Sequence, residues 1–460
     1  MENKLAEFSS ETIPTASILA QMVENREFSK AKLFLNELKE ADLAELLSDM
    51  KSDAALIIYR LLAKELAAKV FVEMPPNLQE DIINSFSDTE LSSTLDLMYI
   101  DDTVDIIEEM PANVVKRILK TSAPKNRELI NRLLKYPQNS AGAMMTTEYL
   151  RLKEEMSVED AVRHVREVAK GKQNIYTCYV TKKDRRLVGV LSLKELLVSD
   201  SGKEIHDIMQ GTVIFAKTTD EKDTVGRKFS KYGLLTLPVV DNELRLVGII
   251  TVDDAIDAIE EEREEDFAKM AAITPSEESY LRRSPISIWK SRIGWLLLLM
   301  VSATFSSTIL SRFEMFLPTV FLLFIPMLMD TGGNCGSQSS VTVIRAISLG
   351  EINFSKLGAV LLKELNVGIL SGLSLGLVAF IKVLAVDRWM MSNESVTVTV
   401  AFSVAITLAL TVITAKLLGA TLPMLAKKIG LDPAVMASPF ITTTKVVFFQ
   451  SFYKIFIFIL

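Results

Sequence analysis

A carboxylate and several glycines interrupt an otherwise apolar stretch of the chain at residues 324–340. The stretch holds Pro326 and Asp330, followed by a run of mostly small and polar residues at 331–340. An ionisable side chain is expensive inside a lipid bilayer, so Asp330 is a candidate functional residue. The alternative is structural, with glycines that let helices approach closely and a buried, hydrogen-bonded Asp330. Both interpretations predict a membrane helix with a kink or an unwound turn.

A second set of oxygen-bearing side chains lies near the C-terminal end. Asp432 begins an apolar segment that also holds Pro439 and the threonines at 442–444. A proline within a helix frees the backbone carbonyl one turn earlier. A freed carbonyl, hydroxyls and a carboxylate on one helix are oxygen ligands for a hard cation. Helix capping alone would also explain Asp432.

Acidic residues are concentrated at 253–266, where nine carboxylates within fourteen residues are opposed only by Arg263. Residues three and four apart share a helix face, so these like charges crowd one another. One interpretation is a solvated charged linker, and the other is neutralisation by divalent cations. Mg²⁺ suits such a site because it takes oxygen ligands and keeps several waters. A smaller acidic group, Asp101, Asp102 and Asp105, lies at a predicted helix start, where negative charge is also favourable by itself.

The bulk composition argues against several classes of protein. The chain has 460 residues and a net charge of -7, which disfavours nucleic acid as a partner. Cys178 and Cys335 are far apart in the sequence and provide neither a disulfide framework nor zinc-ligand spacing. We found no nucleophile paired with a base and no phosphate-binding loop, so the chain is not expected to be an enzyme.

Helical periodicity runs from residue 18 to about 137, in short segments that predict helical hairpins stacked into a superhelix. The motif Arg-Leu-Val-Gly at 186–189 then recurs at 245–248, an offset of 59 residues. Each copy combines a helix, strands and a Ser or Thr that caps a helix, and the tandem arrangement resembles a pair of CBS domains. That resemblance implies an adenosine nucleotide near Thr251–Asp254, although helix capping by itself accounts for this turn.

Five apolar segments are each long enough to span a bilayer: 293–311, 316–343, 357–385, 396–418 and 433–457. Basic residues are concentrated before the first of them and in the loops after the second and fourth. This distribution predicts cytosolic N-terminal domains and a C-terminus outside the cell membrane.

Domain order and local motifs together resemble the MgtE family of magnesium transporters over essentially the whole chain. The most specific motifs are residues 326–339, residues 345–351 and the Asp-Pro-Ala and Ser-Pro-Phe-Ile-Thr-Thr segments within 432–443. The implied fold is an α-helical membrane protein with five transmembrane helices, a cytosolic all-α superhelical domain and an α/β tandem CBS pair. The corresponding boundaries are 1–137 for the superhelix, 138–258 for the CBS pair, 259–290 for an acidic connecting helix and 291–460 for the pore domain.

The resemblance also implies a homodimeric channel for Mg²⁺ influx, closed when cytosolic Mg²⁺ binds among the N-terminal domains. Mg²⁺ is then both the regulatory ligand and the transported ion. Implied metal-binding residues are Asp101, Asp105, Asp223, Asp254, Asp257, Glu262, Glu265, Asp266 and Asp432. Expected ion-path residues are Asp330, Gly332, Gly333, Asn334, Pro439, Thr442 and Thr443.

Two positions depart from the family pattern. Val446 and Gly233 stand where the family carries aspartate, so the central ion site and one sensor site each lack a carboxylate. The alternative function is therefore a membrane-bound divalent-cation sensor that does not conduct, or one with relaxed selectivity for Co²⁺ or Mn²⁺.

Overall fold

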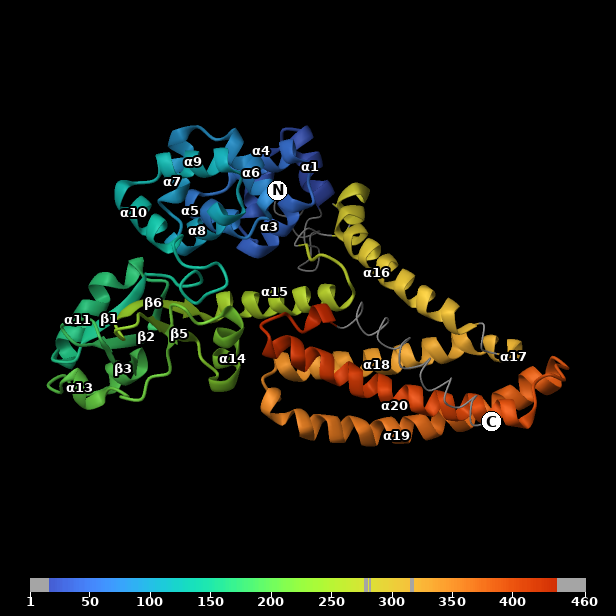
Figure 1. The fold of residues 1–460 in the computed structure, drawn as a ribbon. Helices are drawn as coiled ribbons and strands as arrows, with labels where there is room; N and C mark the ends of the chain where they lie inside the picture. The colour runs from blue at the N-terminus through green and yellow to red at the C-terminus, as the bar shows by residue number, and fades with distance from the viewer. Residues whose placement is uncertain (1–15, 277–279, 281–282, 315–317, 437–460) are drawn as a thin grey trace, which may run out of the picture. The chain divides into compact units, whose positions relative to one another are not determined.

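The computed structural model describes residues 16–276, 280, 283–314 and 318–436, and the chain divides into two compact units, 1–259 and 260–460 (Figure 1). The first unit begins with ten short helices. Their bounds are α1 Ala16–Glu24, α2 Phe28–Leu35, α3 Glu40–Ser48, α4 Ser52–Leu61, α5 Lys64–Val72, α6 Pro76–Ser85, α7 Asp88–Leu95, α8 Ile100–Glu109, α9 Ala112–Thr121 and α10 Pro124–Leu133.

Local sequence signals explain where several of these helices begin. Proline occupies the first turn of α6 and α10, where its missing N–H costs nothing. At α7, Ser87 accepts the backbone N–H of Glu90 and the Glu90 carboxylate accepts that of Ser87, forming a capping box. Contacts such as α3 with α5, α5 with α7 and α8 with α10 link helices two apart in the sequence. The predicted superhelix is confirmed.

Two similar α/β repeats follow, as predicted. The first contains β1 Tyr149–Lys153, α11 Val158–Val168, η1 Ala169–Gly171, β2 Asn174–Thr181, β3 Leu187–Ser192, α12 Leu193–Val198 and α13 Ile205–Ile208. The second contains β4 Ala216–Lys217, α14 Lys222–Tyr232, β5 Thr236–Val240, β6 Leu246–Thr251 and the start of α15 Val252–Met270. In both sheets the first strand pairs parallel to the second, which pairs antiparallel to the third.

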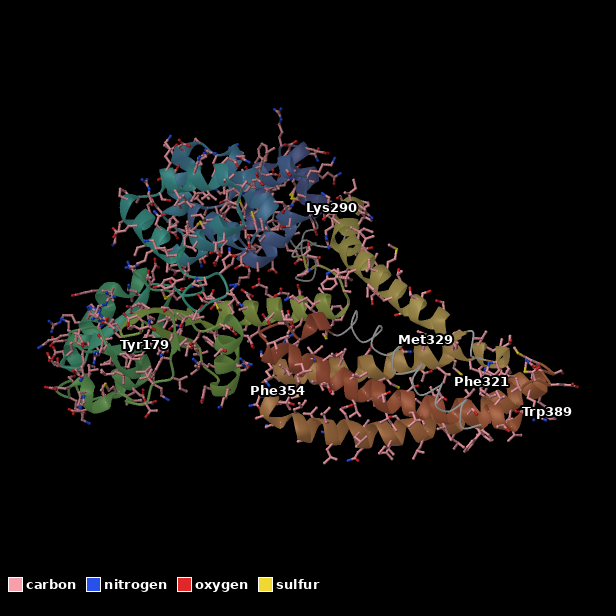
Figure 2. All side chains as sticks on the ribbon, viewed as in Figure 1. Tyr179, Lys290, Phe321, Met329, Phe354 and Trp389 are labelled. Carbon is pink, nitrogen blue, oxygen red and sulfur yellow. The ribbon has the colours of Figure 1, made fainter. Side chains whose placement is uncertain are left out.

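The repeated glycine of the Leu-Val-Gly motif has a steric cause. A Cβ atom on Gly189 would lie 2.3 Å from the sulfur of Met209, and one on Gly248 would lie 2.6 Å from that of Met145. The two repeats are joined through their β-hairpin turns, where the N–H of Leu187 donates to the carbonyl of Leu244 at 3.0 Å. Tyr179 lies at this junction, fully buried (Figure 2).

The second unit is built from long helices. Its elements after α15 are α16 Pro285–Glu314, α17 Thr319–Leu322, α18 Ile325–Ser348, η2 Phe354–Lys356, α19 Leu357–Lys382, the π-helix η3 Val383–Met390, α20 Val398–Lys428 and η4 Ala434–Met436. Helices α18, α19 and α20 lie side by side (Figure 1). Phe354 lies at one end of this bundle and the exposed Trp389 at the other, as expected for a tryptophan at a membrane surface (Figure 2).

Three described helices are long and apolar enough to cross a membrane: Pro285–Thr308, Phe354–Met390 and Val398–Lys428. They correspond to the first, third and fourth predicted spans, although the fourth runs ten residues further than the predicted end at 418. The second predicted span, 316–343, is represented by α17 and α18, and the polar residues of α18 lower its hydropathy. The fifth, 433–457, lies largely outside the described residues.

The predicted unwound turn within 324–340 is wrong. Helix α18 is continuous from Ile325 to Ser348, because Pro326 occupies its first turn, where a proline is compatible with a helix. Its glycines serve helix packing instead: a Cβ atom on Gly332 would lie 2.7 Å from the methyl group of Thr411 on α20. The break in this apolar segment therefore precedes α18, between α17 and α18.

Candidate cation sites

Buried carboxylates from two separated parts of the first unit face one another. Helix α8 supplies Asp101, Asp102 and Asp105, and the start of α15 supplies Asp254. Asp101 is 4% exposed, and neither of its carboxylate oxygens accepts a hydrogen bond of ordinary geometry. Burial raises the pKa of Asp101, and hydrogen bonding from Thr146 and Gln173 offsets this only in part, so the arrangement calls for a compensating positive charge.

Burial, with mutual repulsion as a further cause, raises the pKa values of the carboxyl groups in this cluster. Burial and the charges of Asp101 and Asp254 raise the pKa of both Asp102 and Asp105 to about 8. Burial raises the pKa of Asp254 to about 7, although the hydroxyl of Thr251 donates to its carboxylate at 2.5 Å. At neutral pH, protons and cations therefore compete for the same oxygens.

Sequence reasoning missed several members of this acidic region. Burial and Asp101 raise the pKa of Glu148 to about 7, and burial together with Asp257 raises that of Glu73. Glu73 ends α5 and Glu148 precedes β1, so no local pattern relates them. Asp102, by contrast, belongs to the acidic group at 101–105 that the sequence analysis identified.

The cluster fits a hydrated ion better than a fully dehydrated one. Within the described ranges, no three carboxylate, imidazole or thiolate groups stand at direct metal-ligand spacing. Mg²⁺ keeps several of its waters in protein sites, and these waters can bridge to carboxylates that are too far apart to bind it directly. Asp223 forms an ion pair with Arg227 at 3.0 Å, and it is not among the groups whose charges raise the pKa values of the cluster.

A second acidic group lies within the second unit, at the end of α15. Lys269 pairs with Glu265 and with Asp432, each at 2.6 Å. Asp432 also accepts the backbone N–H of Ala434 at 2.8 Å, which agrees with the predicted capping role. Asp266 accepts a hydrogen bond from the hydroxyl of Ser348 at 3.0 Å. In this structure Asp432 thus binds the ammonium group of Lys269, whereas the family resemblance implies a metal ion at this carboxylate.

Helix α18 has two faces of opposite character. Gly332, Gly333 and Gly336 are buried, whereas Asp330 and Asn334 are exposed and joined by a hydrogen bond of 3.3 Å. The exposed face continues at helical spacing along the rest of α18. Its polar members are Asp330, Asn334, Gln338, Thr342 and Arg345. The structure thus places Asp330 on a polar surface of the helix rather than in its packed core.

A polar network connects the three packed membrane helices. The hydroxyl of Ser339 on α18 donates to Glu364 on α19 at 2.6 Å, and Lys416 on α20 donates to that hydroxyl at 3.4 Å. Lys416 is buried, and the hydroxyl of Ser339 links its ammonium group to the carboxylate of Glu364. The remaining predicted ion-path residues, Pro439, Thr442 and Thr443, lie outside the described residues, as does Val446.

Comparison with known families finds three kinds of match along the chain. Residues 38–139 match the MgtE intracellular N domain, and residues 141–202 and 205–261 each match the CBS domain. Residues 325–447 match MgtE, described as a divalent cation transporter. These ranges correspond to the helical superhelix, the two α/β repeats and the helices from α18 onward.

Two full-length relatives and one solved structure are similar to the chain. The magnesium transporter MgtE of Thermus thermophilus is 34% identical over 415 residues, which are 89% of this chain and 90% of that protein. The magnesium transporter MgtE of Bacillus subtilis is 29% identical over 411 residues, 89% of each protein. The cytosolic domain of the Mg²⁺ channel MgtE in complex with ATP matches with a TM-score of 0.50 and 32% identity, over 53% of this chain and 99% of that one.

Proposed function

This chain belongs to the MgtE family of divalent cation transporters, and from that membership we propose that it carries Mg²⁺ across a membrane. The observation that carries the proposal is the 34% identity to a magnesium transporter over 89% of the chain. Because the relatives that align over most of the chain are transporters, a non-conducting sensor is not favoured. The chain is a membrane protein with cytosolic N-terminal domains, and we propose that its C-terminus lies outside.

The polar face of α18 supports an ion path along that helix. Polar side chains at membrane depth are stable only where they meet protein or water. This face is exposed in the single chain, so we propose that two copies bring their α18 faces to a shared, water-filled path. Pro439, Thr442 and Thr443 belong to the same proposed path through the family resemblance alone.

Replacing Asn334 by leucine is expected to lower Mg²⁺ uptake at least about tenfold, because an apolar group on the polar face removes a partner for Asp330 and for the hydrated ion. The matched control is Ser374→Leu, which makes a similar change at an exposed position of α19. Uptake is measured in cells that lack their own Mg²⁺ transporters. Equal uptake by the two variants at equal expression would refute the path along α18.

We further propose that the carboxylate cluster senses cytosolic Mg²⁺. Its members are Asp101, Asp102, Asp105, Asp254 and Glu148, with Glu73 and Asp257 at its edge. Binding of Mg²⁺ would relieve the repulsion that raises their pKa values, and so hold α8 against the start of α15. The family resemblance extends this regulation to Glu262, Glu265, Asp266 and Asp432, and to Asp223 despite its pairing with Arg227.

Nucleotide binding by the CBS pair is a separate part of the proposal. The related cytosolic domain was solved in complex with ATP, which supports an adenosine nucleotide here as well. The turn at Thr251–Asp254 remains the predicted ribose contact. In the structure the hydroxyl of Thr251 donates a hydrogen bond to the carboxylate of Asp254, so a ribose hydroxyl would have to replace this hydrogen bond.

Expression in cells that lack their own Mg²⁺ transporters tests the function directly. The wild-type chain is expected to restore growth at low Mg²⁺, and Val446→Asp is expected to increase uptake because it adds a negative charge where the family carries aspartate. Co²⁺ and Mn²⁺ uptake, measured in parallel, tests selectivity. Absence of uptake by both proteins, when each is present in the membrane, would refute the transport proposal.

A further inference from the structure

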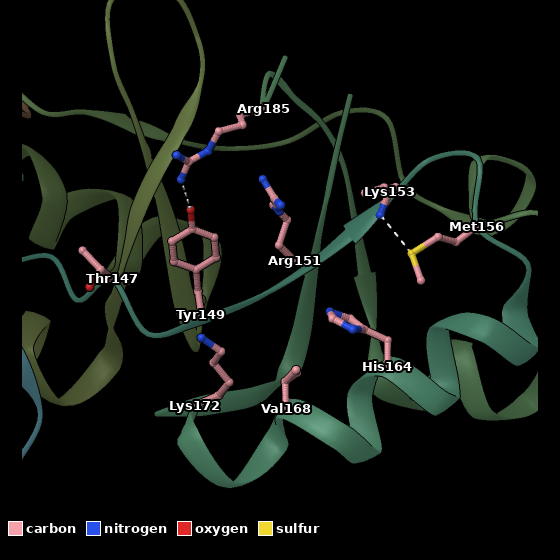
Figure 3. A pocket seen from close by; sticks show the side chains of 9 residues that line it. All are labelled: Thr147, Tyr149, Arg151, Lys153, Met156, His164, Val168, Lys172 and Arg185. Atoms are coloured by element: carbon pink, nitrogen blue, oxygen red, sulfur yellow. Dashed lines mark hydrogen bonds between the residues drawn. The ribbon is translucent and has the colours of Figure 1, made fainter. Parts of the chain in front are cut away.

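Lys416 is a buried lysine within α20, a helix that is long and apolar enough to cross a membrane. Basic side chains of the first CBS repeat are in a different situation. Arg151, Lys153 and Lys172 line a cavity that opens to solvent, where water can hydrate their charges (Figure 3). Lys416 is only 6% exposed, and burial of an ammonium group away from water is costly. Its position therefore requires polar neighbours from the protein.

These neighbours come from the two helices that pack against α20. The ammonium group of Lys416 donates to the hydroxyl of Ser339 on α18 at 3.4 Å. That hydroxyl donates to the carboxylate of Glu364 on α19 at 2.6 Å. Ser339 is itself 2% exposed, so a single buried hydroxyl joins all three helices.

The three side chains form a polar layer between two apolar clusters of the helix bundle. Figure 2 labels Phe321 in one cluster and Phe354 in the other. Cluster members recur every four residues along α18 and α20, with Ser339 and Lys416 at the position between the clusters. These members are Cys335, Val343 and Ile347 on α18, and Leu408, Val412, Ala420 and Met424 on α20. Apolar packing has little directional preference, so the polar layer is the part of this interface that specifies one arrangement.

The neighbouring serine indicates which alternative arrangement the layer excludes. Ser340 is fully buried, yet among the described residues its hydroxyl has no hydrogen-bond partner. Successive residues of an α-helix are about 100° apart, so a rotation of α18 by that angle would bring Ser340 to the place of Ser339. The same rotation would bring Cys335 to the place of Asn334 on the exposed polar face. The hydrogen bond from Ser339 to Glu364 opposes that exchange.

We infer that Lys416, Ser339 and Glu364 are positioning residues that fix the rotation of α18 about its own axis. They act through the helix, because the fixed rotation keeps Asn334 on the polar face and Cys335 in the packed face. For its effect on Mg²⁺ uptake, this inference rests on the proposed ion path along α18. The rotation itself is measured without transport.

The reaction of Cys335 with a small maleimide reports the rotation. Cys335 is 7% exposed, and replacement of the chain's other cysteine, Cys178, by alanine leaves a single thiol. In membranes that contain the full-length protein, Ser339→Ala is expected to raise the reaction rate at least about tenfold, because it removes a hydrogen bond to a charged group. Ser340→Ala is the matched control: it removes the same hydroxyl from the next buried residue and should change the rate by less than about twofold.

A second thiol position distinguishes rotation from a general loosening of the bundle. The parent protein here carries Cys178→Ala, Cys335→Ala and Asn334→Cys, so its thiol lies on the exposed polar face. Rotation moves this position toward the place of the buried Gly333, and Ser339→Ala should therefore slow the reaction at least about threefold. Loosening would leave this rate unchanged or raise it, and that result would overturn the inference.

Lys416→Met is expected to change both thiol rates in the same directions and to lower Mg²⁺ uptake at least about tenfold, because it removes the ammonium group that Ser339 accepts from. Lys363→Met is the control, since Lys363 is an exposed lysine next to Glu364 on α19, and it should keep wild-type rates and uptake. If Lys416→Met does not reach the membrane, Glu364→Gln is measured in its place, with the same expected changes.

Unchanged thiol rates in Ser339→Ala and in the variant of the charged partner, or equal changes in the two controls, would overturn the positioning role. Absence of uptake by the wild-type chain, with the thiol rates changed as expected, would instead refute the transport proposal alone.

Discussion

The variant Asp102→Asn/Asp105→Asn is expected to bind Mg²⁺ at least about tenfold more weakly than the wild-type chain, yet to be the more stable protein without Mg²⁺ at pH 8. Burial and mutual repulsion raise the pKa of both carboxyl groups from 3.8 to about 8, so their ionised forms oppose folding. Relief of one pKa unit corresponds to about 1.4 kcal/mol, a tenfold change in affinity. Amides remove this repulsion together with the attraction for the cation.

The sign of the pH dependence follows from the raised pKa values. Between about pH 4 and pH 8 the folded protein holds protons that the unfolded chain has already released. Stability without Mg²⁺ should therefore fall as pH rises through this window and level off above it. Mg²⁺ replaces those protons, so its stabilising effect should be small near pH 5 and largest at pH 8 and above. Mg²⁺ binding at pH 7 should release protons.

Calorimetric titration of the full-length protein in two buffers of different ionisation enthalpy measures both the affinity and the number of protons released. Asp53→Asn is the control, since Asp53 is an exposed carboxylate on α4 outside the cluster. It should leave the affinity and the proton release unchanged. If the double variant keeps the wild-type affinity, or if Mg²⁺ binding releases no protons at pH 7, the cluster is not the Mg²⁺ sensor.

Gly419→Ala is expected to abolish most Mg²⁺ uptake although it adds a single methyl group. A Cβ atom on Gly419 of α20 would lie 2.2 Å from the carbonyl oxygen of Gly336 on α18. Because that atom belongs to the backbone of a packed helix, no side-chain rotation can relieve the overlap. Overpacking of this kind typically costs about 1–3 kcal/mol, and here the strain must separate the two helices.

Gly358→Ala at the start of α19 provides the control, because a Cβ atom there has no neighbour within 4 Å. Alanine favours helix over glycine, so this variant should retain wild-type uptake. Membrane fractionation establishes that both proteins are inserted, and uptake in cells without their own Mg²⁺ transporters compares their activity. Wild-type uptake by Gly419→Ala would mean that α18 and α20 are less tightly packed than the structure indicates.

Local sequence patterns were sufficient for the elements and their order. The spacing of apolar residues predicted the short N-terminal helices, and the repeat at 186 and 245 predicted two similar α/β units. These features depend on residues near one another in the chain, where helical periodicity, capping and strand alternation act directly. The acidic segment at 253–266 was likewise correctly predicted to lie in a helix, α15.

Tertiary structure decided which charges meet. Glu73 and Glu148 join the acidic cluster on α8 although they lie in the segments after α5 and before β1. Asp223, carried over from the family, pairs instead with Arg227 one helical turn away. A pKa depends on burial and on charges that the fold brings close, and neither can be read from spacing along the chain.

For the membrane helices, too, the sequence indicated an unusual segment, and the tertiary structure decided how that segment packs. The glycines and Asp330 marked α18 as unusual, but the composition of 324–340 was equally compatible with a kink. Only the structure places Pro326 in the first helical turn and assigns glycines and polar residues to opposite faces. Close helix contacts, such as Gly419 against Gly336, depend on the rotation of one helix about its axis relative to another. That rotation is set by packing between segments distant in sequence, so the chain order alone does not determine it.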